Sequence, residues 1–174
     1  MLRITLAAIP LLILFNLKVV AQYNENIIKA AYIERITRFI EWPVKDSNLS
    51  GGSFVIGVYR EPDFLNTLID VFKEKPIKDL KVTVIIIKDP EQISKCNICY
   101  ISEKAKPLIS KFVVNANSNG VLLISKTTDF SKDGVHINFY IEDEKLKFEI
   151  NKKSIDSAGF KVSYLLMQNN RIIQ

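Results

Sequence analysis

The sequence predicts an α/β domain with a mostly parallel sheet, helices on both faces and a C-terminal antiparallel hairpin. Between residues 54 and 125, short apolar runs rich in β-branched side chains alternate with helical segments. Repeated strand–helix–strand units build parallel sheets with right-handed crossovers. After residue 134 the apolar residues alternate with a period of two, which is typical of an antiparallel hairpin. Together these patterns indicate a Rossmann-like, three-layer arrangement.

Residues 1–21 have the pattern of a secretory signal peptide. Arg3 provides a short positive start, an apolar run follows over residues 6–17, and the expected cleavage point lies after Ala21. A membrane anchor is the alternative. However, the run is shorter than the roughly 20 residues that cross a bilayer, and Pro10 interrupts it. The sequence therefore favours an exported protein whose leader is removed.

The part that follows the leader has the size of one domain, residues 22–174. The chain has 174 residues, so 174 − 21 = 153 remain. Removing Arg3 and Lys18 leaves 24 − 2 = 22 Lys and Arg against 19 Asp and Glu, a net charge of +3. A small excess that is scattered along the chain, in an exported protein, argues against a nucleic-acid partner.

The first element is predicted to be an amphipathic helix over residues 26–41. The proline after Trp42 pushes that residue out of the helical region and so ends the helix. The apolar side chains recur with a helical period: Ile28, Ala31, Tyr32, Ile36, Phe39 and Ile40. Glu34, Arg38 and Glu41 fall on the opposite side, and Arg35 falls at the edge of the apolar stripe.

A linker over residues 45–53 precedes four predicted strands and the helices between them. The strands are expected over residues 54–59, 82–87, 98–101 and 121–125. Helices are expected from Pro62-Asp63 onward and over residues 103–114. The run "VTVIII" (82–87) is apolar enough to predict burial on both faces, as in an inner strand of a parallel sheet.

The alternating segments 135–142 and 145–151 are predicted to pair across a two-residue turn at Asp143-Glu144. That turn places apolar residues opposite one another and so sets the register: Ile141 with Leu146, Phe139 with Phe148, and Ile137 with Ile150. The other face of the hairpin is expected to be wet, and it carries His136, the only histidine, as a solvated side chain. A short helix near 154–158 should end at Gly159, and residues 162–173 show a helical period.

Cys96 and Cys99 are spaced as CxxC, which leaves three alternatives open. A redox-active pair needs a helix N-terminus to stabilise the thiolate, but these residues run into a strand. Two residues three apart on an extended chain lie roughly 10 Å apart, and a disulfide needs Cα atoms within about 7 Å. A bridge therefore requires a turn at Asn97-Ile98, and buried unpaired thiols are favoured. One histidine and two cysteines are too few for a zinc site.

A ligand of a parallel sheet binds at the carboxyl ends of its strands. The loops at those ends are 59–61, 88–90, 102–104 and 125–127. The first lacks the glycines of a dinucleotide site, so no nucleotide cofactor is expected. A small anion held by Arg60 and Lys126 is the remaining hypothesis for this edge.

The first helix is a candidate partner-binding surface. Tyr32, Arg35, Arg38 and Trp42 are spaced for one side of a helix, and aromatic residues and arginine are enriched where binding energy concentrates. The other interpretation is that the aromatic side chains only pack the helix on the sheet. Arg35 fits the packing interpretation least well, and the two interpretations stay open.

In order along the chain, these motifs resemble the YfiR-like family of exported bacterial regulators (YfiR/HmsC-like periplasmic proteins). The residues that carry the resemblance are "KAAYIERITRFIEWP" (29–43), "FVIGVY" (54–59), "CNICYIS" (96–102), "VLLIS" (121–125), "GVHINFYIEDEKLKFEIN" (134–151), Gly159 and "SYLLMQNNRII" (163–173). The most telling are the first helix ending in E-W-P and the INF…FEIN hairpin.

The resemblance implies a compact α/β domain in the periplasm that is not an enzyme, needs no cofactor and tends to form a homodimer. Relatives bind the periplasmic part of an inner-membrane diguanylate cyclase and restrain it, which limits cyclic-di-GMP and biofilm formation. A sensor histidine kinase is an equally acceptable partner class. Cys96 stands where the family often carries a cysteine, whereas Cys99 departs from its pattern. A periplasmic small-molecule binder, with its ligand at the strand ends, is the second hypothesis.

Overall fold

The computed structural model describes residues 25–43, 52–168 and 170–173. The predicted signal peptide, its cleavage point after Ala21 and nearly all of the linker lie outside these residues. Within them, no helix is both long enough and apolar enough to span a membrane.

Seven strands form one sheet in the order β3-β2-β4-β5-β6-β7-β9. They are β2 (Ser53–Tyr59), β3 (Lys81–Ile87), β4 (Ile98–Ile101), β5 (Leu122–Ser125), β6 (Ile137–Glu142), β7 (Lys145–Asn151) and β9 (Arg171–Ile173). All neighbours are parallel except β6 and β7, which form the antiparallel hairpin. The predicted fold class is confirmed.

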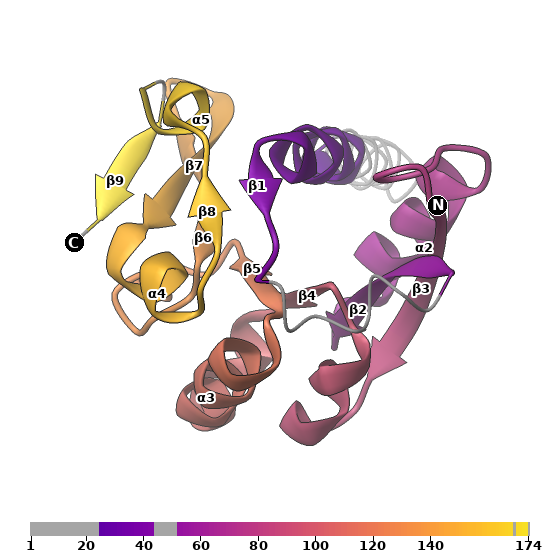
Figure 1. Cartoon of the computed structure of the whole chain (residues 1–174), viewed down its shortest axis with the longest axis horizontal. Coiled ribbons are helices and arrows are strands. Elements are labelled where there is room, and N and C mark those ends of the chain that lie inside the picture. Colours follow the sequence, from indigo (N-terminus) through magenta and orange to yellow (C-terminus); the bar gives the residue numbers. More distant parts are fainter. Residues whose placement is uncertain (1–24, 44–51, 169, 174) are drawn as a thin grey trace, which may run out of the picture.

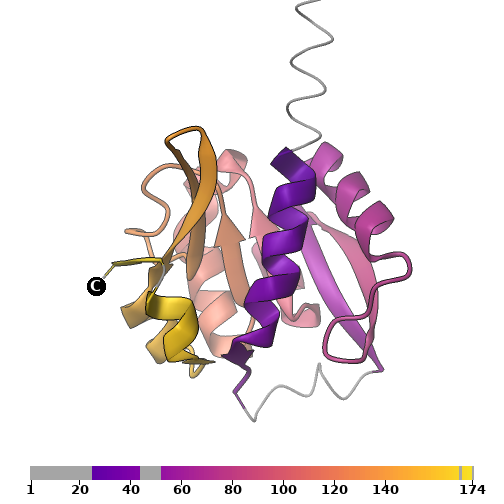
Figure 2. The same cartoon turned by 90° about the horizontal axis from the view of Figure 1, so that it is seen from above.

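Helices cover both faces of this sheet, so the domain has three layers. The N-terminal helix (described over 25–38) and α2 (Pro62–Phe72) lie side by side on one face (Figures 1 and 2). The other face carries α3 (Ile109–Asn119), together with the 3₁₀ segments η2 (Pro90–Lys95) and η3 (Glu103–Leu108). Each layer buries its own apolar cluster against the strands.

The N-terminal helix buries a different stripe from the predicted one. The buried side chains of the helix recur at spacings of three and four: Asn26, Lys29, Ala30, Ile33, Ile36 and Thr37. Ile28, which is 46% exposed, and Ala31 point outward, so their predicted burial is wrong. Three polar residues, Asn26, Lys29 and Thr37, lie in the buried stripe and apolar residues lie outside it, which shifted the apparent period.

The same helix also ends earlier than predicted. It stops at residue 38, and β1 (Ile40–Glu41) pairs antiparallel with β8 (Lys161–Val162) in a separate two-stranded sheet. The chain is extended before Pro43, as a following proline favours. In this extended conformation residues 40 and 41 pair with β8, which they could not do if the helix continued through them.

β3 is an edge strand, which corrects its predicted burial on both faces. No strand pairs with the outer side of β3 in the part of the chain that the structure describes, and Ile86 is 63% exposed. An apolar run alone does not distinguish an inner strand from an edge strand.

The C-terminal segment was predicted wrongly as one helix over 162–173. It contains β8, the short helix α5 (Tyr164–Gln168) and β9, which lies parallel to β7. The Asn170 side chain donates to the carbonyl oxygen of Leu166 at 2.6 Å and so helps to end α5. Partly buried Ile172 then packs against the core.

The hairpin register is confirmed at all three predicted pairs, 141 with 146, 139 with 148 and 137 with 150. Asp143 and Glu144 have φ of 51° and 60°, as a two-residue type I′ turn requires. After β7, the helix α4 (Lys152–Ser157) is followed by Gly159 with φ of 81°. The predicted glycine cap is therefore in place.

The wet face predicted for the hairpin is wrong at its inner end, where His136 is fully buried. Its Nδ1 accepts a hydrogen bond from the Leu123 backbone N–H at 2.9 Å. The proton is therefore on Nε2, which donates to Asn117 Oδ1 at 2.8 Å. The ring also packs edge-on against Phe160. Asn117 of α3 and Phe160 therefore lie against the ring, and burial lowers the pKa of His136 from 6.5 to about 3.

Cys96 and Cys99 are buried free thiols, with no disulfide between them. Burial raises the pKa of Cys96 to about 12 and that of Cys99 well above its ordinary value. Both belong to the apolar cluster on the α3 face. Gly57 of β2 makes room there: a Cβ at this position would lie 2.7 Å from Cys96 Sγ and 2.7 Å from Ile87 Cγ1.

We expect Gly57→Ala to lower the free energy of unfolding by about 1–3 kcal/mol, because the added methyl group overpacks a tight contact. Urea unfolding measures this change. Adding Cys96→Ala removes one of the two clashing atoms, so the double variant should lose less than the sum of the single losses. Strictly additive losses would contradict the contact.

We expect acid to destabilise the protein through His136. A group whose folded pKa is depressed contributes full stability above its unfolded pKa, here 6.5, and loses it as the pH falls toward the folded value of about 3. The free energy of unfolding should fall by at most about 1.4 kcal/mol per pH unit from this group.

The control is His136→Asn, whose carbonyl oxygen still accepts from the Leu123 N–H. It should be less stable at pH 7.5 but should show a shallower decline between pH 7.5 and 5.5, measured by urea unfolding. Parallel pH profiles for the two proteins would rule out His136 as the source.

Candidate functional site

A cleft lies at the carboxyl ends of β2 and β4. β2 continues into α2 on one face, whereas β4 continues into η3 and α3 on the other. Because the connections of these adjacent strands diverge, a crevice opens between them, as in other doubly wound sheets. Its volume is about 790 Å³, and residues of the N-terminal helix and of the segment after β5 complete its walls.

Lys29 is the buried charge of this cleft. Its side chain is 2% exposed, and its ammonium lies 3.5 Å from Glu25 Oε1. The same ammonium lies 4.4 Å from the ring centre of Phe64 and 5.3 Å from that of Tyr100. Burial lowers the pKa of Lys29, and the Glu25 carboxylate opposes that shift.

Two further polar atoms of the cleft are buried without hydrogen bonds. Ser102 Oγ and Glu25 Oε1 have no hydrogen-bond partner in the structure as described. Ser102 directly follows β4, at the point where the chain turns toward η3. Burial also raises the pKa of the neighbouring Tyr100 phenol, so this group stays protonated and neutral.

The predicted anion pair, Arg60 and Lys126, is not brought together. Lys126 lines the cleft, and its ammonium lies 2.6 Å from Glu25 Oε2. Arg60 is exposed, has φ of 54° and stacks its guanidinium 5.3 Å from the Tyr59 ring, outside the cleft lining. Of the four predicted loops, those after β4 and β5 line the cleft along with Glu61, whereas the loop after β3 does not.

Tyr32 and Trp42, two of the four predicted partner-binding residues, face inward. The Trp42 indole is 9% exposed, donates to the Asn97 carbonyl at 3.3 Å and packs edge-on against Phe54 and Phe160. The half-buried Tyr32 ring packs on Phe148, and its hydroxyl donates to the Leu146 carbonyl at 3.2 Å. Packing explains both residues.

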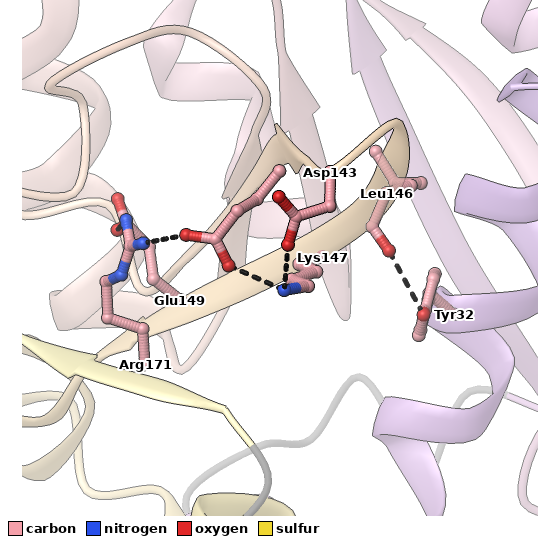
Figure 3. Close-up of polar contacts among 7 residues, drawn as sticks. Tyr32, Asp143, Leu146, Lys147, Glu149 and Arg171 are labelled. Atoms are coloured by element: carbon pink, nitrogen blue, oxygen red, sulfur yellow. Dashed lines mark hydrogen bonds and ion pairs between the residues drawn. The ribbon is translucent and has the colours of Figure 1, made fainter.

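Figure 3 shows how Tyr32 reaches the hairpin beside a chain of ion pairs. Lys147 lies 2.5 Å from Glu142 and 3.9 Å from Asp143. Arg171 of β9 contacts the same Glu142 at 2.8 Å and Glu149 at 3.7 Å. These contacts hold the hairpin between the N-terminal helix and β9.

Arg35 and Arg38 face outward on the N-terminal helix, as a binding surface requires. Arg38 is held by Glu34 through an ion pair of 2.6 Å, one helical turn away. Arg35 is exposed beside the apolar Ile28 and Ala31. The two arginines therefore share the outer side of the helix, as their spacing predicts. Tyr32 and Trp42, which were predicted to lie on the same side, face the sheet instead.

Sequence reasoning missed Lys29 and Glu25. Both lie on the helix that was interpreted as an apolar stripe with charges opposite. The available signal was their spacing of four residues, which joins a glutamate to a lysine on one helical side. Lys29 also recurs with Ile33 and Ile36, which places it within the buried stripe.

The histidine and the two cysteines contribute to packing and do not line the cleft. His136 and the two thiols are buried and lie away from the cleft lining. Within the described ranges, no three His, Cys, Asp or Glu side chains come together as a metal site.

Comparison with solved structures supports the fold. A conserved domain protein from Vibrio cholerae O1 biovar El Tor matches with a TM-score of 0.53 at 13% identity, over 76% of this chain. This chain spans 60% of that protein, and at this identity the likeness concerns the fold alone.

A 3-hydroxyacyl-CoA dehydrogenase from Archaeoglobus fulgidus matches with a TM-score of 0.35 at 10% identity. The match covers 74% of this chain and 51% of the dehydrogenase chain. That likeness is too low to bear on function. Among curated proteins, none matches the chain.

The sequence pattern of one family covers almost the whole described domain. It matches residues 26–169, from the N-terminal helix through α5, and includes the E-W-P motif (41–43) and the hairpin. The chain therefore belongs to the YfiR/HmsC-like family.

Proposed function

We propose that this protein is an exported, non-enzymatic regulator. It acts in the periplasm, where it binds and restrains the periplasmic part of an inner-membrane signalling protein, a diguanylate cyclase or a sensor kinase. The family match over residues 26–169 carries this proposal, because it covers the fold and not only one motif. The signal-peptide pattern of residues 1–21 agrees with it.

The mechanism is stoichiometric binding. A bound regulator shifts a sensor between two arrangements only if it binds one of them more tightly than the other. The reactive groups of the domain are consistent with such a role, since the histidine is locked by two hydrogen bonds and the thiols are buried.

The outer side of the N-terminal helix is the proposed contact surface. It presents Arg35 and Arg38 beside Ile28 and Ala31, a combination of cations and apolar area that suits a protein interface. Tyr32 and Trp42 support this surface from beneath by fixing the helix on the sheet. A homodimer, as the resemblance implies, is part of the proposal.

We expect the tagged domain 22–174 to capture a diguanylate cyclase or a sensor kinase, identified by mass spectrometry, from detergent-solubilised membranes of its host. Arg35→Glu should reduce this capture by about tenfold or more, because it reverses a charge at a contact. Lys111→Glu is the matched control, since Lys111 is an exposed cation on α3, on the opposite face of the sheet. Recovery of no such membrane protein, or equal losses in both variants, would contradict the proposal.

We also expect the full chain, expressed in a Gram-negative host, to appear in the periplasmic fraction with Gln22 as its first residue. Intact-mass measurement of that fraction gives the answer. Ala21→Asp should block cleavage, because the cleavage site needs a small residue. A mature protein that retains residues 1–21 would overturn the proposed processing.

A further inference from the structure

Among the residues that line the cleft at the ends of β2 and β4, three buried polar groups lack full partners. The Ser102 hydroxyl has no hydrogen bond in the described part of the chain, and Glu25 Oε1 has none beyond its ion pair with Lys29. The Lys29 ammonium has one ion pair at 3.5 Å, longer than a normal charge-assisted hydrogen bond. Buried polar groups in proteins are otherwise nearly always hydrogen-bonded.

The positions and the hydrogen-bonding capacity of these three groups indicate which chemical groups of a ligand could bind them. Lys29 and Ser102 come from the N-terminal helix and the end of β4, two elements far apart in the sequence, and both side chains are more than nine-tenths buried. Both can donate a hydrogen bond, so they suit an anionic oxygen group. Glu25 Oε1 can only accept and therefore suits an amine or hydroxyl group.

The charges around the cleft narrow the choice further. The lining carries four lysines, at positions 29, 104, 106 and 126, and four acidic residues, at positions 25, 61, 103 and 129. A balanced lining favours a ligand with little net charge over a polyanion. The volume of the cleft, about 790 Å³, lies within the range of small-molecule pockets.

We propose that this cleft binds a small carboxylic acid that carries a neighbouring amine or hydroxyl, that is, an amino acid or a hydroxy acid. Lys29 and Ser102 hold its carboxylate, and Glu25 holds its amine or hydroxyl. The Phe64 and Tyr100 rings keep the Lys29 ammonium in place. Burial lowers the pKa of Lys29, and a bound carboxylate would offset this shift.

The test is isothermal titration calorimetry on the domain 22–174, with each of the twenty L-amino acids and with glycolate, L-lactate and L-malate as probes. We expect at least one probe to bind with a dissociation constant of about 1 mM or lower. For that probe, Lys29→Met should weaken binding by about tenfold or more, and Ser102→Ala by a smaller factor of roughly three to ten.

Arg60→Ala is the matched control, because Arg60 follows β2 but lies outside the cleft lining. It should bind the probe as the unmodified domain does. Urea unfolding checks that each variant is folded. Should Lys29→Met fail to fold, Ser102→Ala and Glu25→Gln decide the outcome.

The proposal is overturned if no probe binds, or if the cleft variants bind as tightly as the unmodified domain. Neither result touches the proposed regulatory function, because capture of the membrane protein is measured without these probes and depends on the opposite side of the helix. Loss of capture would likewise leave the calorimetry unaffected.

Discussion

The burial of the N-terminal helix against the sheet is the interaction on which the rest of the structure depends. α2 covers the face over β2 and β3, so the remaining strands need a second cover for their apolar side chains. The helix supplies it with Ile33 and Ile36, which are completely buried in that cluster. Each fully buried side chain of this size contributes about 1.5–3 kcal/mol relative to its exposed state.

That single packing arrangement fixes the orientation of everything else the helix carries. Because the side chains recur every 3.6 residues, seating the apolar stripe forces Lys29 into the cleft and Arg35 toward solvent. Tyr32, in the middle of the helix, donates a hydrogen bond to the carbonyl of Leu146 in β7, and Trp42, beyond the end of the helix, donates one to the carbonyl of Asn97 just before β4. One helix therefore joins the candidate ligand cleft to the candidate partner surface.

Sequence reasoning succeeded where the pattern was strictly local. The hairpin register follows from a period of two and a two-residue turn, and both are visible in the residues from Ile137 to Ile150. The helix phase was missed because Lys29 and Thr37 are buried polar residues, which only a tertiary partner or a backbone contact accommodates. The C-terminal segment was missed because β9 gains its hydrogen bonds from β7, which no local pattern reveals.

The candidate site was predictable only in outline. Strand-end logic located the loops of Ser102 and Lys126, because the carboxyl ends of parallel strands meet at one edge. It could not show that Arg60, in a left-handed backbone conformation, turns away toward the Tyr59 ring. The same reasoning could not identify Glu25 and Lys29 as cleft residues. They belong to the N-terminal helix and reach the strand ends only because this helix packs on the sheet.

The short ladder between β1 and β8 has a consequence for the order of folding. Its Ile40–Val162 pair joins residues 162 − 40 = 122 positions apart, a closure over most of the described chain. Such distant pairings are slow to form, since the intervening chain must first be ordered. The packing of the N-terminal helix is therefore complete only after β8 has formed. A truncated polypeptide that stops before residue 160 would lack β8, the strand that pairs with β1 directly after this helix.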